Sequence, residues 1–297
     1  MKILTKLLTT LFSLCLMFSV ILICLVMSLS VFFKSDIYIE ALTETNAYEE
    51  IQQSIQNNLD DMMLLNNIET STLKDLITTD EVKAIVNQDV NSIINWLNNK
   101  NSTIETLDLS IYEARFDERM NTFFRDHQYF LDESAKKDVE VMKQNALQFI
   151  EGYVRLLDFE KLTQSPLLQM IPKLISYLNL VIVGLVLLTF IFIGLNVALS
   201  PRSQSSRKKI EEGFLWSGYG VLAGGLMVFV VFFSGVQSKF YEHTAIHLTY
   251  LKQLLAFLIK HGLTTLYVSG LIAASLGMIL MLPYWTMLYK KYITTES

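Results

Sequence analysis

The chain has 297 residues, 52% of them apolar, and a formal net charge of −5. Its mean hydropathy of +0.37 is too high for a typical soluble domain. Segment 34–173 carries 13 basic and 25 acidic residues, a net charge of −12, which would repel nucleic-acid phosphates and so excludes nucleic acid as a partner.

The first element in chain order is an apolar run over residues 7–33, preceded by Lys2 and Lys6. The run has no charge and is long enough to cross a bilayer as a helix. Its length and its ending "SVFFKS" favour an uncleaved anchor over a cleavable signal peptide. Cys15 and Cys24 both lie in it, so the polar segment that follows has no disulfide. We expect residues 1–33 to form an N-terminal transmembrane anchor.

Residues 34–173 predict an acidic domain built only from helices, because no alternating strand pattern or Asn-Gly hairpin turn occurs there. Helix starts are indicated by Asn46, by Thr78-x-x-Glu81 as a capping box, and by Ser110 and Asp132. The amphipathic helices that follow can bury their apolar faces on one another as a bundle.

The segment Ile77 to Leu97 is the helix that the sequence specifies best. Its apolar residues recur every three or four positions and predict one buried face. They are Val82, Ile85, Val86, Val90, Ile93, Ile94 and Leu97. Its polar side is the predicted partner face, formed by Asp80, Lys83, Gln88 and Asn91.

Three further apolar runs, at about 175–199, 214–235 and 262–288, complete the chain. Each is long enough to span a membrane, so residues 174–297 predict a three-span membrane domain with loops at 200–213 and 236–261. The fold class is therefore an all-α membrane protein: four transmembrane helices plus a helical-bundle domain inserted between spans 1 and 2.

Basic residues predict the orientation of these spans. With four spans, the N-terminus, loop 200–213 and the C-terminus share one side, and that side carries the basic clusters. They are Lys2, Lys6, Arg202, Arg207, Lys208, Lys209, Lys290 and Lys291. The positive-inside rule then makes that side cytoplasmic. We expect a multi-pass plasma-membrane protein with cytoplasmic termini, and with segments 34–173 and 236–261 outside.

Small residues in the last two spans predict close helix packing. They are Gly220 and Gly224 in the third span, and Ser269, Ala273 and Gly277 in the fourth. Spaced four residues apart, such residues let helix backbones approach closely. This favours packing of spans three and four on each other or on a partner, and it is compatible with a homo-oligomer through these faces.

Sites for chemistry are weakly indicated. His243 and His247 could supply half of a metal site if they share a helical face, but the surrounding aromatic and apolar residues favour an interfacial helix. Asp126-His127, Asp60-Asp61 and Asp117-Glu118 favour a solvated helix surface over acid–base catalysis. We expect no catalytic residue, no metal and no cofactor.

The text "DIYIEALTETNAYEEIQQSI", "LKDLITTDEVKAIVNQDVNSIINWL" and "FLWSGYGVLAGGLMV" resembles a family of uncharacterised integral membrane proteins of Gram-positive bacteria. That resemblance covers most of the chain and implies an anchor, an outer helical domain and three C-terminal spans. In topology alone the chain also resembles FtsX-type permeases, although the connection "RKKIEEGFLWSG" is short for a segment that couples to an ATPase.

These observations favour a non-enzymatic plasma-membrane protein that binds, scaffolds or senses a membrane or envelope protein partner. The lipid bilayer is its other partner. The alternative is a permease-like subunit of an ABC-type complex, which transmits the signal of a cytoplasmic ATPase to the outer domain.

Overall fold

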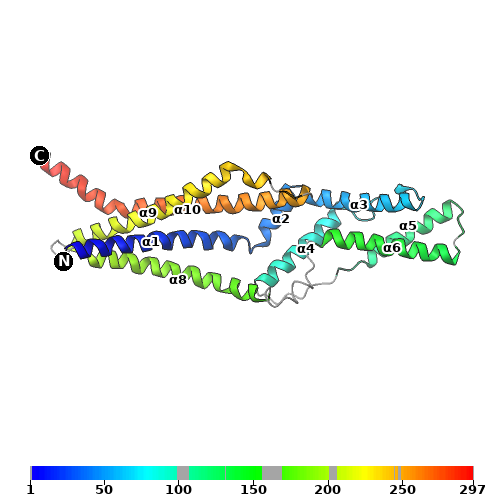
Figure 1. Ribbon diagram of the computed structural model, residues 1–297, viewed down its shortest axis with the longest axis horizontal. Helices are drawn as coiled ribbons and strands as arrows, with labels where there is room; N and C mark the ends of the chain where they lie inside the picture. The colour runs from blue at the N-terminus through cyan, green and yellow to red at the C-terminus, as the bar shows by residue number, and fades with distance from the viewer. Residues whose placement is uncertain are drawn as a thin grey trace. The chain divides into compact units, whose positions relative to one another are not determined.

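The computed structural model describes residues 2–98, 107–130, 132–155, 169–200, 206–243, 245–246 and 249–296, and within these ranges it contains helices and no strand. The all-helical fold predicted from the sequence is therefore confirmed for the described part of the chain. Figure 1 shows the elements in chain order along the colour bar.

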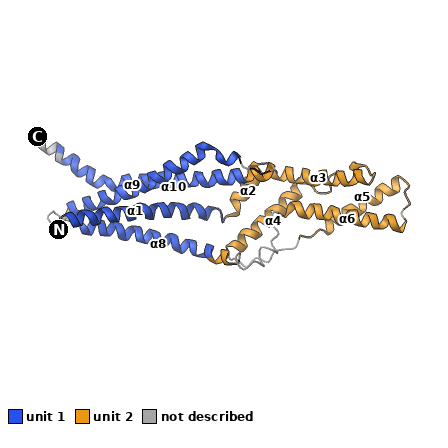
Figure 2. Cartoon of the chain, in the orientation of Figure 1, with its two compact units in different colours: residues 1–33, 174–245, 255–297 blue, residues 34–173, 246–254 orange. Residues whose placement is uncertain are grey.

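The chain divides into two compact units, coloured separately in Figure 2. Unit 1 consists of residues 1–33, 174–245 and 255–297, and unit 2 of residues 34–173 and 246–254. Unit 2 therefore contains, besides the predicted polar domain, a short segment from the region predicted as loop 236–261.

Unit 1 is built on four long apolar helices: α1 (Lys2–Val31), α8 (Met170–Leu199), α9 (Ser206–Ser238) and α10 (Thr249–Glu296). Each has the length and composition needed to cross a membrane. The helices extend beyond the apolar runs, so segment 200–213 is helical from Ser206 and segment 236–261 is helical again from Thr249. The apolar runs are shorter than the helices, because backbone hydrogen bonding continues into polar sequence wherever no cap or proline ends the helix.

The spanning helices alternate in direction within unit 1. Along the contacts between α1 and α9 the residue numbers of both helices rise together, so these two helices are parallel. Along the contacts between α9 and α10 the numbers rise on one helix and fall on the other, so this pair is antiparallel. The defining contacts are Ser13 with Trp216 and Met17 with Gly224 for the first pair, and Gly218 with Met281 and Gly225 with Ala274 for the second. The α8 helix is antiparallel to α9, with Asn196 on Ser217 and Val197 on Gly213. This alternation is the one that four successive crossings of a membrane would produce.

Unit 2 is a helical bundle of α2 (Ser35–Glu44), α3 (Ala47–Leu65), the short 3₁₀ helix η1 (Thr70–Leu73), α4 (Thr79–Leu97), α5 (Ser110–Asp126) and α6 (Glu133–Val154). Its core is formed by apolar side chains from all of these elements, among them Leu42, Ile51, Leu73, Val86, Phe116 and Ile150. Tyr250, from the first turn of α10, is buried in the same core, with Leu251 and Leu254 packed against it.

Two predicted helix caps are confirmed. Thr78 Oγ1 accepts a hydrogen bond from the Glu81 amide, and a Glu81 carboxylate oxygen accepts one from the Thr78 amide, which completes the capping box of α4. Asp132 caps α6 by accepting a hydrogen bond from the Ala135 amide at 2.8 Å.

Two other predicted starts differ in their chemistry. The α5 helix does begin at Ser110, but its N-cap position is Leu109, which makes no side-chain cap; the Asp108 carboxylate just before it accepts a hydrogen bond from the Ser110 amide. Asn46 does precede α3, but with φ 51° and without a side-chain cap, because it turns the chain between α2 and α3 in the left-handed conformation that Asn tolerates. The separate helix α2 was not predicted, since its ten residues carry only a weak apolar pattern.

Candidate functional site

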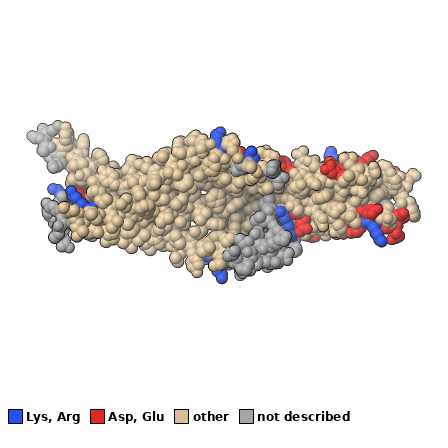
Figure 3. All heavy atoms as spheres, in the orientation of Figure 1, with Lys and Arg blue, Asp and Glu red and all other residues tan. Residues whose placement is uncertain are grey.

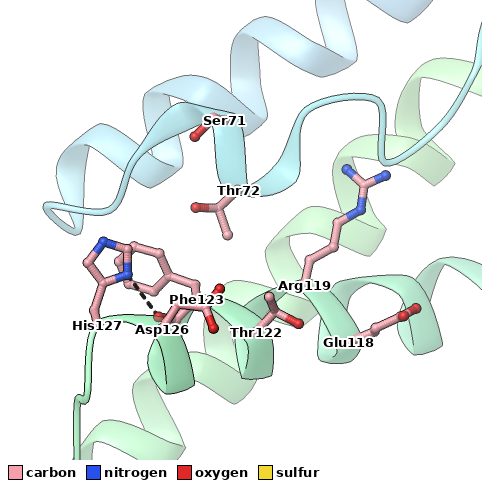
Figure 4. Close-up of a pocket in the computed structure, with 8 residues that line it drawn as sticks. All are labelled: Ser71, Thr72, Glu118, Arg119, Thr122, Phe123, Asp126 and His127. Carbon is pink, nitrogen blue, oxygen red and sulfur yellow. Dashed lines mark hydrogen bonds between the residues drawn. The ribbon is translucent and has the colours of Figure 1, made fainter.

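A polar cleft of about 520 Å³ lies in unit 2 between η1 and the C-terminal half of α5 (Figure 4). Its lining combines hydroxyls, two carboxylates, a guanidinium, an imidazole and one aromatic ring. The residues are Ser71 and Thr72 from η1, and Glu118, Arg119, Thr122, Phe123, Asp126 and His127 from α5 and the turn after it. A cavity of this size is large enough for a small ligand or an extended segment of a partner.

Helical spacing on α5 creates one wall of the cleft. Glu118, Thr122 and Asp126 follow one another at intervals of four residues, which places them along one line on the helix surface. A second line, displaced by one residue, holds Arg119, Phe123 and His127, and η1 supplies the opposite wall. The predicted reading of Asp126 and His127 as solvated surface agrees with their exposure, but the structure also brings them together with Glu118.

The Arg119 side chain fixes the turn that follows η1. Its guanidinium donates hydrogen bonds to the backbone carbonyls of Lys74 and Asp75. Asp75 has a left-handed backbone, with φ 56°, and its amide donates to Gln56 Oε1 at 2.9 Å. Because the guanidinium is engaged with these carbonyls, the charges left for an occupant are the carboxylates of Glu118 and Asp126, and Asp126 also pairs with Arg125 at 3.2 Å.

The His127 ring has a defined tautomer. Its Nδ1 lies 2.9 Å from the backbone carbonyl of Phe123 (Figure 4), and since a carbonyl can only accept, Nδ1 must carry the proton. In the neutral ring Nε2 then has a lone pair, and in Figure 4 this nitrogen points towards η1. The ring is flanked by Phe123, with centroids 4.3 Å apart, and by Tyr129 at 6.1 Å.

An ion pair joins α5 to α4 behind the cleft. Arg115 donates to both carboxylate oxygens of Glu81, at 3.0 and 2.7 Å. The pKa of Glu81 is lowered to about 2, mainly by the hydrogen bond from the Arg115 guanidinium and to a smaller extent by hydrogen bonds from Thr78. The same side chain thus caps α4 and ties it to α5.

A second ionic network joins α5 to α6. Lys143 on α6 is buried, with Nζ 2.9 Å from Glu140, 3.3 Å from Asp117 and 3.4 Å from Glu113. These carboxylates raise the pKa of Lys143 far above its ordinary range, and Lys143 in turn lowers the pKa of Glu140. The two networks hold α5, and with it one wall of the cleft, against both neighbouring helices.

The predicted partner face of α4 is accessible in the structure. Asp80, Lys83, Gln88 and Asn91 are all exposed, and the Lys83 ammonium lies 5.7 Å from the centroid of the Tyr48 ring. None of these four residues lines the cleft, so the structure offers two separate surfaces of unit 2 where a partner could be sought.

Only one of the two candidate metal ligands lies in the described part of the chain. His243 ends the 3₁₀ helix η2 (Phe240–His243) and is exposed, whereas Ala245 and Ile246 beyond it are not helical. His247 lies outside the described residues. Whether the two imidazoles share a face therefore stays a prediction. A single interfacial helix over this stretch is wrong, because Ala245 and Ile246 interrupt it between η2 and α10.

The small residues of the last spans pack within the chain. Gly220 and Gly224 face α1 and not α10: a Cβ on Gly224 would lie 2.8 Å from the Met17 carbonyl. Gly277 does face α9, where a Cβ would lie 2.5 Å from the Leu222 amide nitrogen. Ser269 and Ala273 lie in a cavity wall of unit 1. A homo-oligomer stays a prediction, and the faces of Gly220 and Gly224 are already covered by α1.

The basic residues that set the predicted topology lie near helix ends. Lys6, Lys208 and Lys290 are exposed, and Lys209 is half-buried. Arg202 lies outside the described residues, as do the side chains of Lys2, Arg207 and Lys291. On the face shown in Figure 3, acidic side chains gather over α3, α5 and α6, whereas the surface of the spanning helices is almost free of charge.

Sequence reasoning missed three features of the structure. The two rows of cleft residues on α5, which start at Glu118 and Arg119, were detectable as spacings of four residues. That η1 lies opposite these rows becomes visible only in the fold. The burial of Lys143 gave no signal, because only Glu140 is near it in sequence and its other two partners lie on α5. Glu211 was missed because it precedes the third apolar run, yet α9 begins at Ser206 and buries this side chain to 7% exposure.

Fold and site together define an all-helical protein with four membrane-spanning candidates and a polar helical unit that carries a cleft. No family model matches the chain, and no curated protein and no solved structure matches it either. The resemblance to Gram-positive membrane proteins and the topological likeness to permeases therefore stay expectations from the sequence.

Proposed function

We propose that the chain is a non-enzymatic plasma-membrane protein of the bacterial envelope, in which unit 2 lies outside the cytoplasm and binds an envelope partner through its cleft. The observation that carries the proposal is the position of the ionisable lining: the cleft of Glu118, Asp126 and His127 belongs to unit 2 and not to the spanning helices. The four helices of unit 1 serve as its membrane anchor.

The outer location of unit 2 is supported by its composition and its core. Residues 246–254, which follow the third span, pack with residues 34–173, which follow the first. Two segments of one compact core must lie on the same side of a membrane, and an even number of crossings separates them here. The basic residues Lys6, Lys208 and Lys290 on the opposite side favour a cytoplasmic location for that side.

The chemistry of the cleft favours a partner with basic or hydrogen-bond-donating groups. Glu118 and Asp126 are exposed carboxylates, while Arg119 is engaged with backbone carbonyls. Hydroxyls of Ser71 and Thr72 can donate or accept, so a peptide segment of mixed polarity is a suitable occupant. The net charge of −12 over residues 34–173 would attract a basic partner at long range.

A role in binding is favoured over hydrolysis by the arrangement of the hydroxyls. Among the described residues of the cleft, no hydrogen bond joins Ser71 or Thr72 to the His127 ring, whereas an activated nucleophile needs such a contact. The permease-like alternative stays a second hypothesis. It requires an ATPase to bind segment 200–213, which is helical from Ser206.

The proposal is tested by site-specific photocrosslinking in intact cells. A benzoyl-phenylalanine is placed at Thr122 in the cleft or, as a matched control, at Asn91 on the exposed face of α4; both positions are exposed on helices of unit 2. We expect a discrete crosslinked protein from Thr122 that is lost when Asp126→Asn is added. Crosslinks from Asn91 alone would move the binding site to the α4 face, and none from either position would refute partner binding by unit 2.

The topology is tested with a cysteine-free chain (Cys15→Ser, Cys24→Ser) that carries one reporter cysteine. Gln128→Cys, in unit 2, should react with a membrane-impermeant maleimide added to intact cells. Lys208→Cys, at the start of α9, should react only after the cells are opened. The reverse pattern would overturn the proposed orientation.

A further inference from the structure

A cavity of about 490 Å³ lies inside unit 1 between α1, α8 and α10. Its walls are apolar side chains, among them Val20, Ile193 and Leu276, and the groups in it with polar atoms are Cys24, Thr189 and Ser269. The hydroxyl of Thr189 donates to the Leu185 carbonyl and that of Ser269 to the Leu266 carbonyl, so both are satisfied within their own helices. Both hydroxyl protons are therefore engaged, and the cavity offers few of the hydrogen-bond partners that a polar ligand or water would need.

The cavity lies beside the middle of α8, whose buried residues are Pro172 and Ile175 near its N-terminal end and Asn196 near its C-terminal end. There, Asn196 Nδ2 donates to Ser217 Oγ at 3.2 Å, and the Phe192 ring lies 5.9 Å from that of Phe12. No residue of α8 between 176 and 195 is buried. Figure 1 shows α8 diverging from α1 away from this attachment, and both helices belong to unit 1.

The surroundings of the cavity determine what can fill it. All its walls belong to helices long and apolar enough to cross a membrane, so the molecules with access are those of the hydrocarbon core. An α-helix is about 10 Å wide, and 490 Å³ would hold roughly one turn of it, which excludes a partner helix. A flexible hydrocarbon chain fits a slot of this size.

We propose that this cavity is an intramembrane site for one acyl chain of a bilayer phospholipid. The acyl chain moves from hydrocarbon into an equally apolar space, so the hydrophobic effect contributes little to its binding. The favourable free energy comes from van der Waals contacts with cavity walls that would otherwise face a void. The site would occupy the wedge between α8 and the other helices, on the side of α1 that carries Cys24.

The test uses the full chain in lipid nanodiscs that contain a phospholipid with a diazirine near the middle of one acyl chain. After irradiation, adducts are mapped by peptide mass spectrometry at rising fractions of the probe. We expect adducts to concentrate on residues 20–27 and 269–280 and to saturate. Ala273→Phe, which fills the cavity, should lower them about tenfold.

The matched control is Gly184→Phe on α8, where nothing lies within 4 Å of an added Cβ, and it should leave the adducts unchanged. Val186→Phe fills the cavity from the loosely packed wall, so it tests the site even if Ala273→Phe misfolds. Adducts that rise in proportion to the probe, spread over the exposed surface of α8 and persist in both filling variants would show ordinary lipid contact and overturn the proposal.

Discussion

The Glu81–Arg115 ion pair predicts how the stability of unit 2 depends on pH. Glu81 has an ordinary pKa of 4.5, which is lowered to about 2 in the folded chain. At 1.36 kcal/mol per pKa unit the ceiling for its contribution is about 3 kcal/mol. The side chains of Glu81 and Arg115 are 29% and 35% exposed, so solvent screening reduces the expected value to about 1–2 kcal/mol.

The sign follows from the depressed pKa. The contribution is complete above about pH 5 and is lost as the pH falls through 4.5 towards 2, because the unfolded chain takes up the proton first. Replacing Glu81→Gln removes the charge while an amide can still complete the capping box. We therefore expect the variant to be less stable by about 1–2 kcal/mol at pH 7 and to converge with the unchanged chain near pH 2.5.

The assay is chemical unfolding of the full chain in detergent, followed by the fluorescence of Trp96 on α4 after Trp216 and Trp285 have been replaced by Phe. The control is Glu118→Gln, an exposed carboxylate on α5 outside the ion pair, which should change stability by less than about 0.5 kcal/mol. An equal loss for Glu81→Gln at pH 7 and pH 2.5, or no loss at pH 7, would refute the reasoning.

Three further predictions concern the packing and charge of the two units. Gly224→Leu should lower the stability of unit 1 by about 1–3 kcal/mol by forcing α9 away from α1, whereas Gly184→Leu, in open space, should not; thermal unfolding in detergent compares them. Lys143→Met should destabilise unit 2 by about 1–3 kcal/mol at pH 7, because three carboxylates lose their cation, and this deficit should shrink below pH 4 in the same Trp96 assay. Asp132→Ala should cost about 1 kcal/mol and raise amide exchange in the first turn of α6, and equal exchange in both chains would contradict a capping role.

The sequence predicted those parts of the fold that depend on local patterns. The four apolar helices and the buried face of α4 follow from composition and from the spacing of Val82, Val86, Val90 and Ile94, all of which are buried. The cap at Thr78 was readable because its partner Glu81 lies three residues away. The start of α5 at Ser110 was readable, but the hydrogen bond from its amide to Asp108 was not, because several neighbouring polar residues can bond the first amides of a helix.

Features that depend on long-range packing were not predictable. Glycine spacing indicated close helix contacts but not the partner, so Gly220 and Gly224 were expected against α10 or another chain and lie instead against α1. Tyr250 resembled an interfacial aromatic, yet it completes the core of unit 2, because that core is assembled from segments about 200 residues apart. The cleft likewise requires η1 and α5 to meet across the bundle.

The α5 helix is the element of unit 2 on which these features converge. It lines the cleft with Glu118 and His127, it is tied to α4 through Arg115, and it supplies two of the three carboxylates that surround Lys143 on α6. A ligand that binds to the carboxylates of α5 therefore contacts the helix that is held in place by both ionic networks. A displacement of α5 would strain the Arg115 and Lys143 contacts together, so the free energy of binding at the cleft would be shared with α4 and α6 and not confined to a loop. A sensor requires this kind of coupling between a binding site and the helices that surround it.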